Sequence, residues 1–218
     1  MPNALSDRPV RLAAASLSAV AGYVDAVGFL MTGGFFVSFM SGNTTRAGIG
    51  LAEQAAAGVI GAGLIALFVV GVIFGALVGR AARAHRRPVV LILVTALLVA
   101  AAGAASFGAV HLAVAAMVMA MGAENTVFAE DGEVKIGVTY MTGTLVKLGK
   151  KITTALMGGD RLGWAPYLLL WLGLLAGALL GAAAYSLAGT GALWGAAAMM
   201  GLLSLVVARI APRPPRSE

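Results

Sequence analysis

The sequence contains no cysteine and little charge, and both absences narrow what the protein can be. Without cysteine, disulfides, thiolate metal ligands and thiol nucleophiles are excluded. Only 11% of the 218 residues are Asp, Glu, Lys or Arg, whereas an average soluble domain has about 25%. This is too little charge to cover a water-facing surface, and a soluble globular protein is therefore excluded.

Apolar residues dominate instead, at 60% of the chain, with a mean hydropathy of +0.94. Six apolar runs approach the length of about 20 residues that a membrane-crossing helix needs. They span residues 12–30, 58–79, 89–107, 111–128, 164–187 and 192–210. The first run is too long for a signal peptide and continues to Asp25, so it is interpreted as a membrane helix. We expect an all-α, polytopic membrane helix bundle of about six transmembrane helices.

Arginine and lysine predict the orientation of this bundle. The net charge of +6 lies almost entirely in loops and tails, a pattern that reports membrane topology rather than nucleic-acid binding. The loop 80–88 carries four arginines and is expected in the cytoplasm of a bacterial cell, at the inner membrane. The two ends of the chain are also basic, and both termini are predicted to be cytoplasmic.

Two further stretches, 31–54 and 132–157, are apolar but interrupted by polar residues. Each is too long for a tight loop and too polar for an ordinary span. Six spans agree with the arginine pattern only if each stretch enters and leaves the membrane on one side. If both stretches crossed fully, the loop 80–88 would lie outside, so we expect broken or re-entrant segments.

The two interrupted stretches resemble each other, which indicates an internal repeat. Both contain a hydroxyl, an aromatic, Met, a hydroxyl and Gly, with an offset of 101 residues (139 − 38): Ser38-Phe39-Met40-Ser41-Gly42 and Thr139-Tyr140-Met141-Thr142-Gly143. Glycines 71, 75 and 79 match 173, 177 and 181 at an offset of 102, and residues 22–25 match 122–125 at 100. Each half has three crossings, an odd number, so the second half must be inverted. The sequence predicts a 3+3 inverted repeat, with halves 11–107 and 109–210, as in many transporters.

Irregular backbone at membrane depth is tolerated only inside protein or beside a water-filled cavity. The helix starts that follow such backbone expose amides, which attract anions or polar oxygens. We therefore expect a site for a small polar solute, with an anion among the candidates. Its predicted binding residues are Ser41, Gly42, Asn43, Thr44, Thr142, Gly143 and Thr144, and Gly33 and Gly34 are predicted hinges. The alternative is two ordinary turns followed by capped helices.

Two carboxyls lie within predicted spans, Asp25 and Glu124. A charge at the centre of a membrane helix costs about 2.5–3.5 kcal/mol on insertion scales, so each should face the protein interior and have a partner. Arg46 and Lys147 are the predicted partners, directly or as cross pairs. The carboxyls could couple transport to a proton or cation, or form structural ion pairs. For Glu124, near the cytoplasmic end of its span, the structural interpretation is favoured.

The glycines at every fourth residue, 71/75/79 and 173/177/181, each line one helix face and permit close helix contact. Packing within the chain is the simpler interpretation, and a homo-oligomer through these faces is the alternative. No phosphate-binding glycine loop, nucleophile elbow or HExxH motif occurs, and the two histidines are far apart. No catalytic residue, metal site or cofactor is predicted.

A resemblance to a known family rests on the N-terminal motif. The run Ala21-Gly-Tyr-Val-Asp-Ala-Val-Gly-Phe-Leu30, followed by Gly33-Gly-Phe35 and Ser38-Phe-Met-Ser-Gly-Asn-Thr44, resembles the signature of the YoaK family of bacterial multi-spanning membrane proteins. The segment Tyr140-Met-Thr-Gly143 is similar to that family too, so the resemblance covers nearly the whole chain. It implies a six-span membrane protein of a family whose function is unknown, and it supplies no substrate or mechanism.

The repeat and the polar residues within it favour a small secondary transporter or channel for a small polar solute, for which proton coupling is one option. A membrane scaffold or assembly factor that moves no solute is the main alternative. An intramembrane enzyme is less favoured, because the chain has no cysteine and no well-placed histidine at membrane depth.

Overall fold

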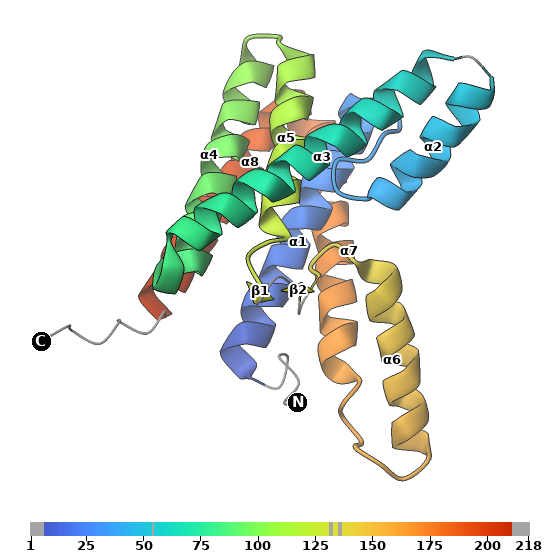
Figure 1. Cartoon of the computed structure of the whole chain (residues 1–218), viewed down its shortest axis with the longest axis vertical. Helices are drawn as coiled ribbons and strands as arrows, with labels where there is room; N and C mark the ends of the chain where they lie inside the picture. Colours follow the sequence, from blue (N-terminus) through green and yellow to red (C-terminus); the bar gives the residue numbers. More distant parts are fainter. Residues whose placement is uncertain (1–6, 54, 131–132, 135–136, 211–218) are drawn as a thin grey trace, which may run out of the picture.

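The computed structural model describes residues 7–53, 55–130, 133–134 and 137–210, and this part of the chain is almost entirely helical (Figure 1). The α-helices are α1 (Arg8–Met31), α2 (Met40–Ala52), α3 (Ala56–Ala81), α4 (Arg86–Ser106), α5 (Val110–Glu124), α6 (Met141–Leu156), α7 (Ala165–Ala188) and α8 (Ala192–Ile210). Short 3-10 turns, η1 (Arg83–His85) and η2 (Gly189–Gly191), precede α4 and α8. The strands β1 (Ala129–Glu130) and β2 (Glu133–Val134) pair as an antiparallel ribbon.

The long helices are apolar enough to cross a membrane. Four stretches meet this criterion by length and composition: Arg8–Thr32, Ala56–Ala81, Arg86–Ser106 and Ala165–Arg209. The last comprises α7 and α8, and α5 is a shorter apolar helix. The outer surface is apolar as well. On α3, for example, Val69, Ile73, Phe74 and Leu77 are all at least half exposed, which suits lipid contact and not water. The expected all-α polytopic membrane bundle is confirmed.

The core forms where α1, α4, α5 and α8 meet. Helix α1 packs against α7 and α8, and α4 packs against α5 and α8. Helix α3 crosses the outside of α5, and α1 and α5 also touch each other. The largest fully buried apolar side chains come mainly from these helices: Leu17, Leu91, Leu98, Met117, Met121, Leu170, Leu193 and Met200.

Helices α2 and α6 form hairpins with the long helices that follow them. Figure 1 shows the α2–α3 hairpin projecting at the upper right and the α6–α7 hairpin at the lower right. With 13 and 16 residues, α2 and α6 extend about 20 and 24 Å at a rise of 1.5 Å per residue. Neither helix spans a hydrocarbon core of about 30 Å.

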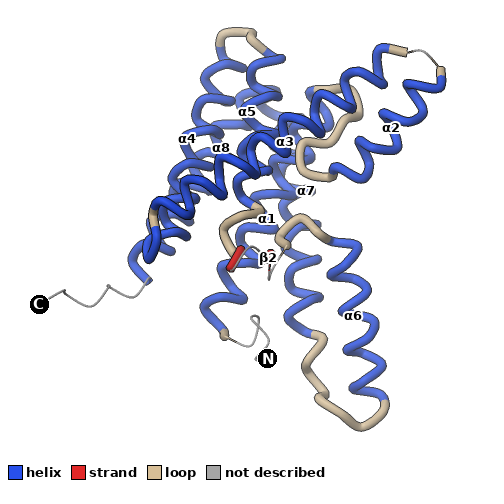
Figure 2. Tube along the Cα trace, viewed as in Figure 1, coloured by secondary structure: helices blue, strands red, loops and turns tan. Residues whose placement is uncertain are grey.

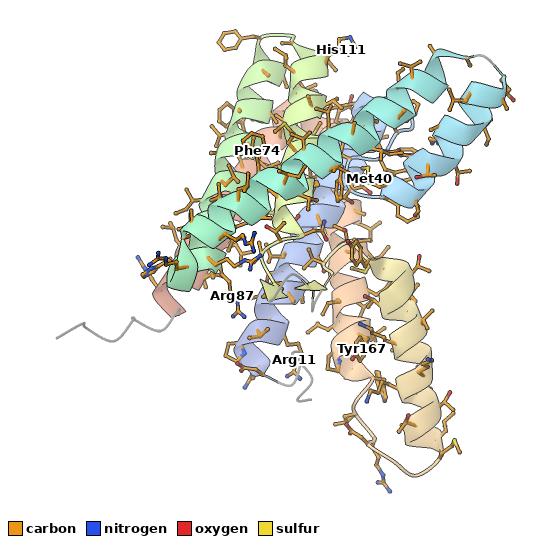
Figure 3. The ribbon with its side chains drawn as sticks, in the orientation of Figure 1. Arg11, Met40, Phe74, Arg87, His111 and Tyr167 are labelled. Carbon is orange, nitrogen blue, oxygen red and sulfur yellow. The ribbon has the colours of Figure 1, made fainter. Side chains whose placement is uncertain are left out.

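Both short helices begin near the middle of the molecule and run to opposite ends of it (Figure 1). Figure 2 shows the irregular segments that precede them. The start of α1 and the end of α8 lie toward the same end of the molecule. Arg11 and Arg87 are found toward this end, whereas His111 lies at the opposite end (Figure 3).

Candidate functional site

Asp25 of α1 fixes the first irregular segment, residues 32–39, which we call the first loop. Its Oδ1 accepts hydrogen bonds from the amides of Val37 and Ser38, each at 2.8 Å. Asp25 lies six residues before the end of α1, so the loop folds back by about 9 Å along the helix. These donors, and not the expected Arg46, are the partners of Asp25 in the described part of the chain.

Asn43 of α2 fixes the same loop from its other side. Its Oδ1 accepts a hydrogen bond from the Phe36 amide at 3.0 Å, and its Nδ2 donates to the Phe36 carbonyl at 2.7 Å. The residue is fully buried. Asp25 and Asn43 together satisfy backbone groups that the hydrocarbon region could not satisfy. The side-chain amide of Asn43 is therefore occupied within the protein.

Glycine is required where the first loop leaves α1, because Gly33 and Gly34 have φ angles of +67° and +121°. Arg46 lies over this turn. Its guanidinium carbon is 5.7 Å from the ring centroid of Phe29 and 5.5 Å from that of Phe35, within the range of cation–π attraction. A Cβ atom on Gly34 would lie 3.2 Å from the guanidinium nitrogens. The predicted hinge is thus a tight turn, and the guanidinium of Arg46 packs against it.

The other predicted binding residues of the first half lie on the first turn of α2. Ser41 and Thr44 are exposed, and the Thr44 hydroxyl donates to the Met40 carbonyl at 2.9 Å. A Cβ atom on Gly42 would collide with the rings of Phe36 and Phe39. Ser41 and Thr44 therefore remain accessible to a solute, whereas Gly42 leaves room for the aromatic rings.

The second half repeats the backbone pattern of the first. The Met40 amide donates to the Ser38 carbonyl at 3.2 Å, and the Met141 amide donates to the Thr139 carbonyl at 2.9 Å. Three residues further along each half, the main-chain amides of Asn43 and Thr144 donate to the carbonyls of Phe39 and Tyr140. The offset of 101 residues found in the sequence thus joins segments of equal local geometry.

Different side chains fix the second irregular segment, of which residues 137–140 are described and form what we call the second loop. Ser18 of α1 donates to the Val138 carbonyl at 2.9 Å, and the Thr139 hydroxyl donates to Oδ1 of Asn125 at 3.0 Å. Asn125 stands at the position equivalent to Asp25, so the repeat could have identified it. No sequence signal singled out Ser18, since a serine on an apolar helix face is common.

The remaining predicted residues of the second half are dispersed. Thr144 is buried, whereas Thr142, Gly143 and Lys147 are exposed. Glu124, the last residue of α5, is 0% exposed, and neither of its carboxyl oxygens has a hydrogen-bond partner. The expected pair between Glu124 and Lys147 is therefore not formed in the described structure.

Glu124 continues a buried stripe of α5. Met121 follows Met117 by four residues and Glu124 follows Met121 by three, which places all three on one helix face. All three are fully buried. Helix α5 contacts α1, α3 and α4. Of the two carboxyls within apolar helices, Asp25 accepts two hydrogen bonds from backbone amides, whereas Glu124 has no hydrogen-bond partner. In the described part of the chain no three His, Asp or Glu side chains gather to hold a metal ion.

The glycine faces of α3 and α7 are used inside the chain. On each helix, glycines leave room for a backbone of α5 or α1: Gly71 faces Met119, Gly75 faces Ala123, Gly177 faces Ala19 and Gly181 faces Tyr23. By contacts, Gly71 therefore corresponds to Gly177, an offset of 106 (177 − 71), and not to Gly173. The two registers differ by four residues, about one helical turn, and glycine at every fourth position fits both. A homo-oligomer would need a different surface.

These features define a polytopic transmembrane protein with two irregular segments held by buried polar side chains. The chain belongs to the family described as "Protein of unknown function (DUF1275)", which it matches over residues 13–206. It is 37% identical over 181 residues to the UPF0700 transmembrane protein RA0705 of Rhizobium meliloti (strain 1021), which covers 83% of this chain and 78% of the relative. The resemblance to the YoaK family is thereby confirmed. No solved structure matches the chain.

Proposed function

We propose that the protein is a small secondary transporter that carries a small polar solute across the bacterial inner membrane, with Glu124 as its proton-coupling group. The observation that supports this most is the complete burial of Glu124 without a hydrogen-bond partner. An ionised carboxylate without a partner costs several kcal/mol in a dry protein interior. Intramembrane carboxyls of this kind are typical of proton relays in transporters.

In this proposal Glu124 carries a proton in the conformation described. Release of the proton requires water at the carboxyl, and water requires a change in the packing around α5. Solute movement and proton release then depend on the same opening, which is the basis of coupling. Asp25 is the weaker candidate, because its carboxylate already accepts hydrogen bonds from the first loop.

An inverted repeat would supply two such openings, one on each side of the membrane. Its support is the match between contacts in the two halves: Gly22 against Leu174 in one pair of helices, and Gly122 against Phe68 in the other. In this interpretation 11–107 and 109–210 are the two halves. Helices α2 and α6 then point to opposite sides, and both termini lie in the cytoplasm.

The solute would meet the exposed hydroxyls at the starts of the short helices, Ser41 and Thr44 on α2 and Thr142 on α6. Arg46 and Lys147 lie one turn further along these helices and favour an anion among polar solutes. The rival proposal is a scaffold that binds a partner helix through the glycine faces. It is less favoured, because α1 and α5 lie against those faces.

Proton movement in proteoliposomes tests this proposal. Vesicles loaded with a pH-sensitive dye would receive nitrate, phosphate, succinate, alanine or glycerol outside. We expect at least one solute to change the internal pH in vesicles with the wild-type protein. Glu124→Gln should reduce the initial rate at least tenfold, whereas Glu53→Gln, at an exposed carboxyl, should leave it within about twofold.

Two outcomes would contradict the proposal in different ways. If no member of the panel moved a proton in vesicles with folded wild-type protein, the transporter assignment would fail. If Glu124→Gln moved protons as fast as wild type, transport would stand and the role of Glu124 would be wrong.

A further inference from the structure

We infer that the second loop, residues 137–140, is the gate through which water reaches Glu124, and that Ser18 and Asn125 are the positioning residues that hold it closed. The inference rests on the proposed role of Glu124. It concerns which of the two loops opens, and it is carried by a difference in how the loops are fixed.

The first loop is held by charge. A carboxylate, Asp25, accepts hydrogen bonds from successive backbone amides, and Asn43 adds a two-bond clamp on Phe36. Hydrogen bonds to an ionised group are roughly twice as strong as those between neutral groups. Opening the first loop must therefore break these charge-assisted bonds together with the clamp.

In the described part of the chain, neutral groups hold the second loop. Ser18 donates to the Val138 carbonyl, and Thr139 donates to the Asn125 amide oxygen. Asn125 replaces the charged Asp25, and Thr144 replaces the clamping Asn43. A threonine hydroxyl cannot bond one peptide unit through separate donor and acceptor atoms, as an asparagine amide does. The second loop therefore opens at a lower free-energy cost.

The position of the second loop suits a gate for Glu124. Asn125 directly follows Glu124, and Ser18 belongs to α1, which contacts α5. The loop thus joins the end of α5 to the neighbouring helix. Val138 and Thr139 are only 1% and 8% exposed, so the loop is packed inside the protein, and Thr139 is bonded to the residue that follows Glu124. If the bonds to Ser18 and Asn125 are both lost, the loop is released from α1 and from the end of α5.

Thiol labelling can compare the two loops directly, since the chain has no cysteine of its own. Val37→Cys and Val138→Cys place the probe at equivalent, equally buried positions, because Val37 is 0% exposed and Val138 is 1% exposed. Each variant would be reconstituted in nanodiscs, where both faces meet solvent, and treated with a cationic methanethiosulfonate reagent. We expect Val138→Cys to react at least tenfold faster. Equal rates, or a faster Val37→Cys, would overturn the inference.

The link to Glu124 needs a second probe, Glu124→Cys. We expect Ser18→Ala to accelerate its labelling several-fold, whereas Ser38→Ala, a serine-to-alanine change within the first loop, should leave the rate unchanged. Thr139→Val removes the other attachment and should accelerate labelling by a similar factor. It takes the place of Ser18→Ala if Ser18→Ala folds poorly. Unchanged labelling of Glu124→Cys in both gate variants would overturn the inference. Because these rates need no solute or proton flux, their failure is distinguishable from failure of the transporter proposal.

Discussion

Asp25 and Glu124 are carboxyls in apolar helices, and their surroundings give them opposite roles. Asp25 accepts hydrogen bonds from backbone amides only 12 and 13 residues away, and these bonds allow the first loop to lie inside the bundle. Glu124 has no such donors. The internal repeat suggested Arg46 and Lys147 as partners, but the first loop folds back along its own helix and brings amides within hydrogen-bond distance of Asp25.

Replacement of Asp25 tests its role in holding the first loop. Asp25→Leu leaves two buried amides without an acceptor, and each costs about 1–3 kcal/mol. We expect a loss of about 3 kcal/mol in the free energy of unfolding. Asp25→Asn keeps one carbonyl oxygen as acceptor and should lose about 1 kcal/mol. Denaturant titration in detergent micelles, followed by circular dichroism, would measure both.

The exposed Glu53→Gln serves as the control and should unfold like wild type. If Asp25→Leu were as stable as Asp25→Asn, the hydrogen bonds to the first loop would not be a source of stability.

At the scale of elements, close helix packing depends on glycine at the crossing points. The carbonyls of α1 lie against Gly173, Gly177 and Gly181 of α7, and α5 lies against α3 in a similar way. Small residues at such contacts let backbones approach, and this approach supplies much of the packing attraction between membrane helices. The short helices are fixed differently, since α2 and α6 each pack mainly against the following long helix.

Gly177→Ala tests the α1–α7 contact. The added methyl would collide with the carbonyl of Ala19, and such overpacking costs about 1–3 kcal/mol. Gly63→Ala on α3 is the control, because nothing lies within 4 Å of the new Cβ. We expect Gly177→Ala to melt clearly below wild type in thermal unfolding, and Gly63→Ala to melt at or above it. Equal melting temperatures for the two variants would contradict the close contact.

At the scale of the whole molecule, basic side chains mark one end. The start of α1, the junction of α3 and α4 and the end of α8 lie toward this end, and the α4–α5 turn lies at the other (Figure 1). Excess Arg and Lys favours the cytoplasmic side. This end of the molecule is therefore the one that we expect to face the cytoplasm.

Cysteine accessibility in intact cells tests this orientation. Phe107→Cys lies in the turn between α4 and α5, where Phe107 is 92% exposed. We expect a membrane-impermeant maleimide to label it from the periplasmic side once the outer membrane is permeabilised. Ala81→Cys, at the end of α3, should react only after the inner membrane is disrupted. The reverse pattern would mean that the bundle is inserted the other way up.

The sequence by itself determined that this is a polytopic helical membrane protein with two irregular segments, because apolar length and polar interruptions are properties of contiguous residues. It also located Asp25 and the repeated Ser-Gly and Thr-Gly motifs. The register of the glycine helices could not be predicted, since a shift of one turn preserves the same helix face. Only the tertiary structure showed that Glu124 is unpartnered and that Ser18 holds Val138, 120 residues away. Burial and hydrogen bonding at these positions depend on which distant helices meet, and local sequence does not specify that.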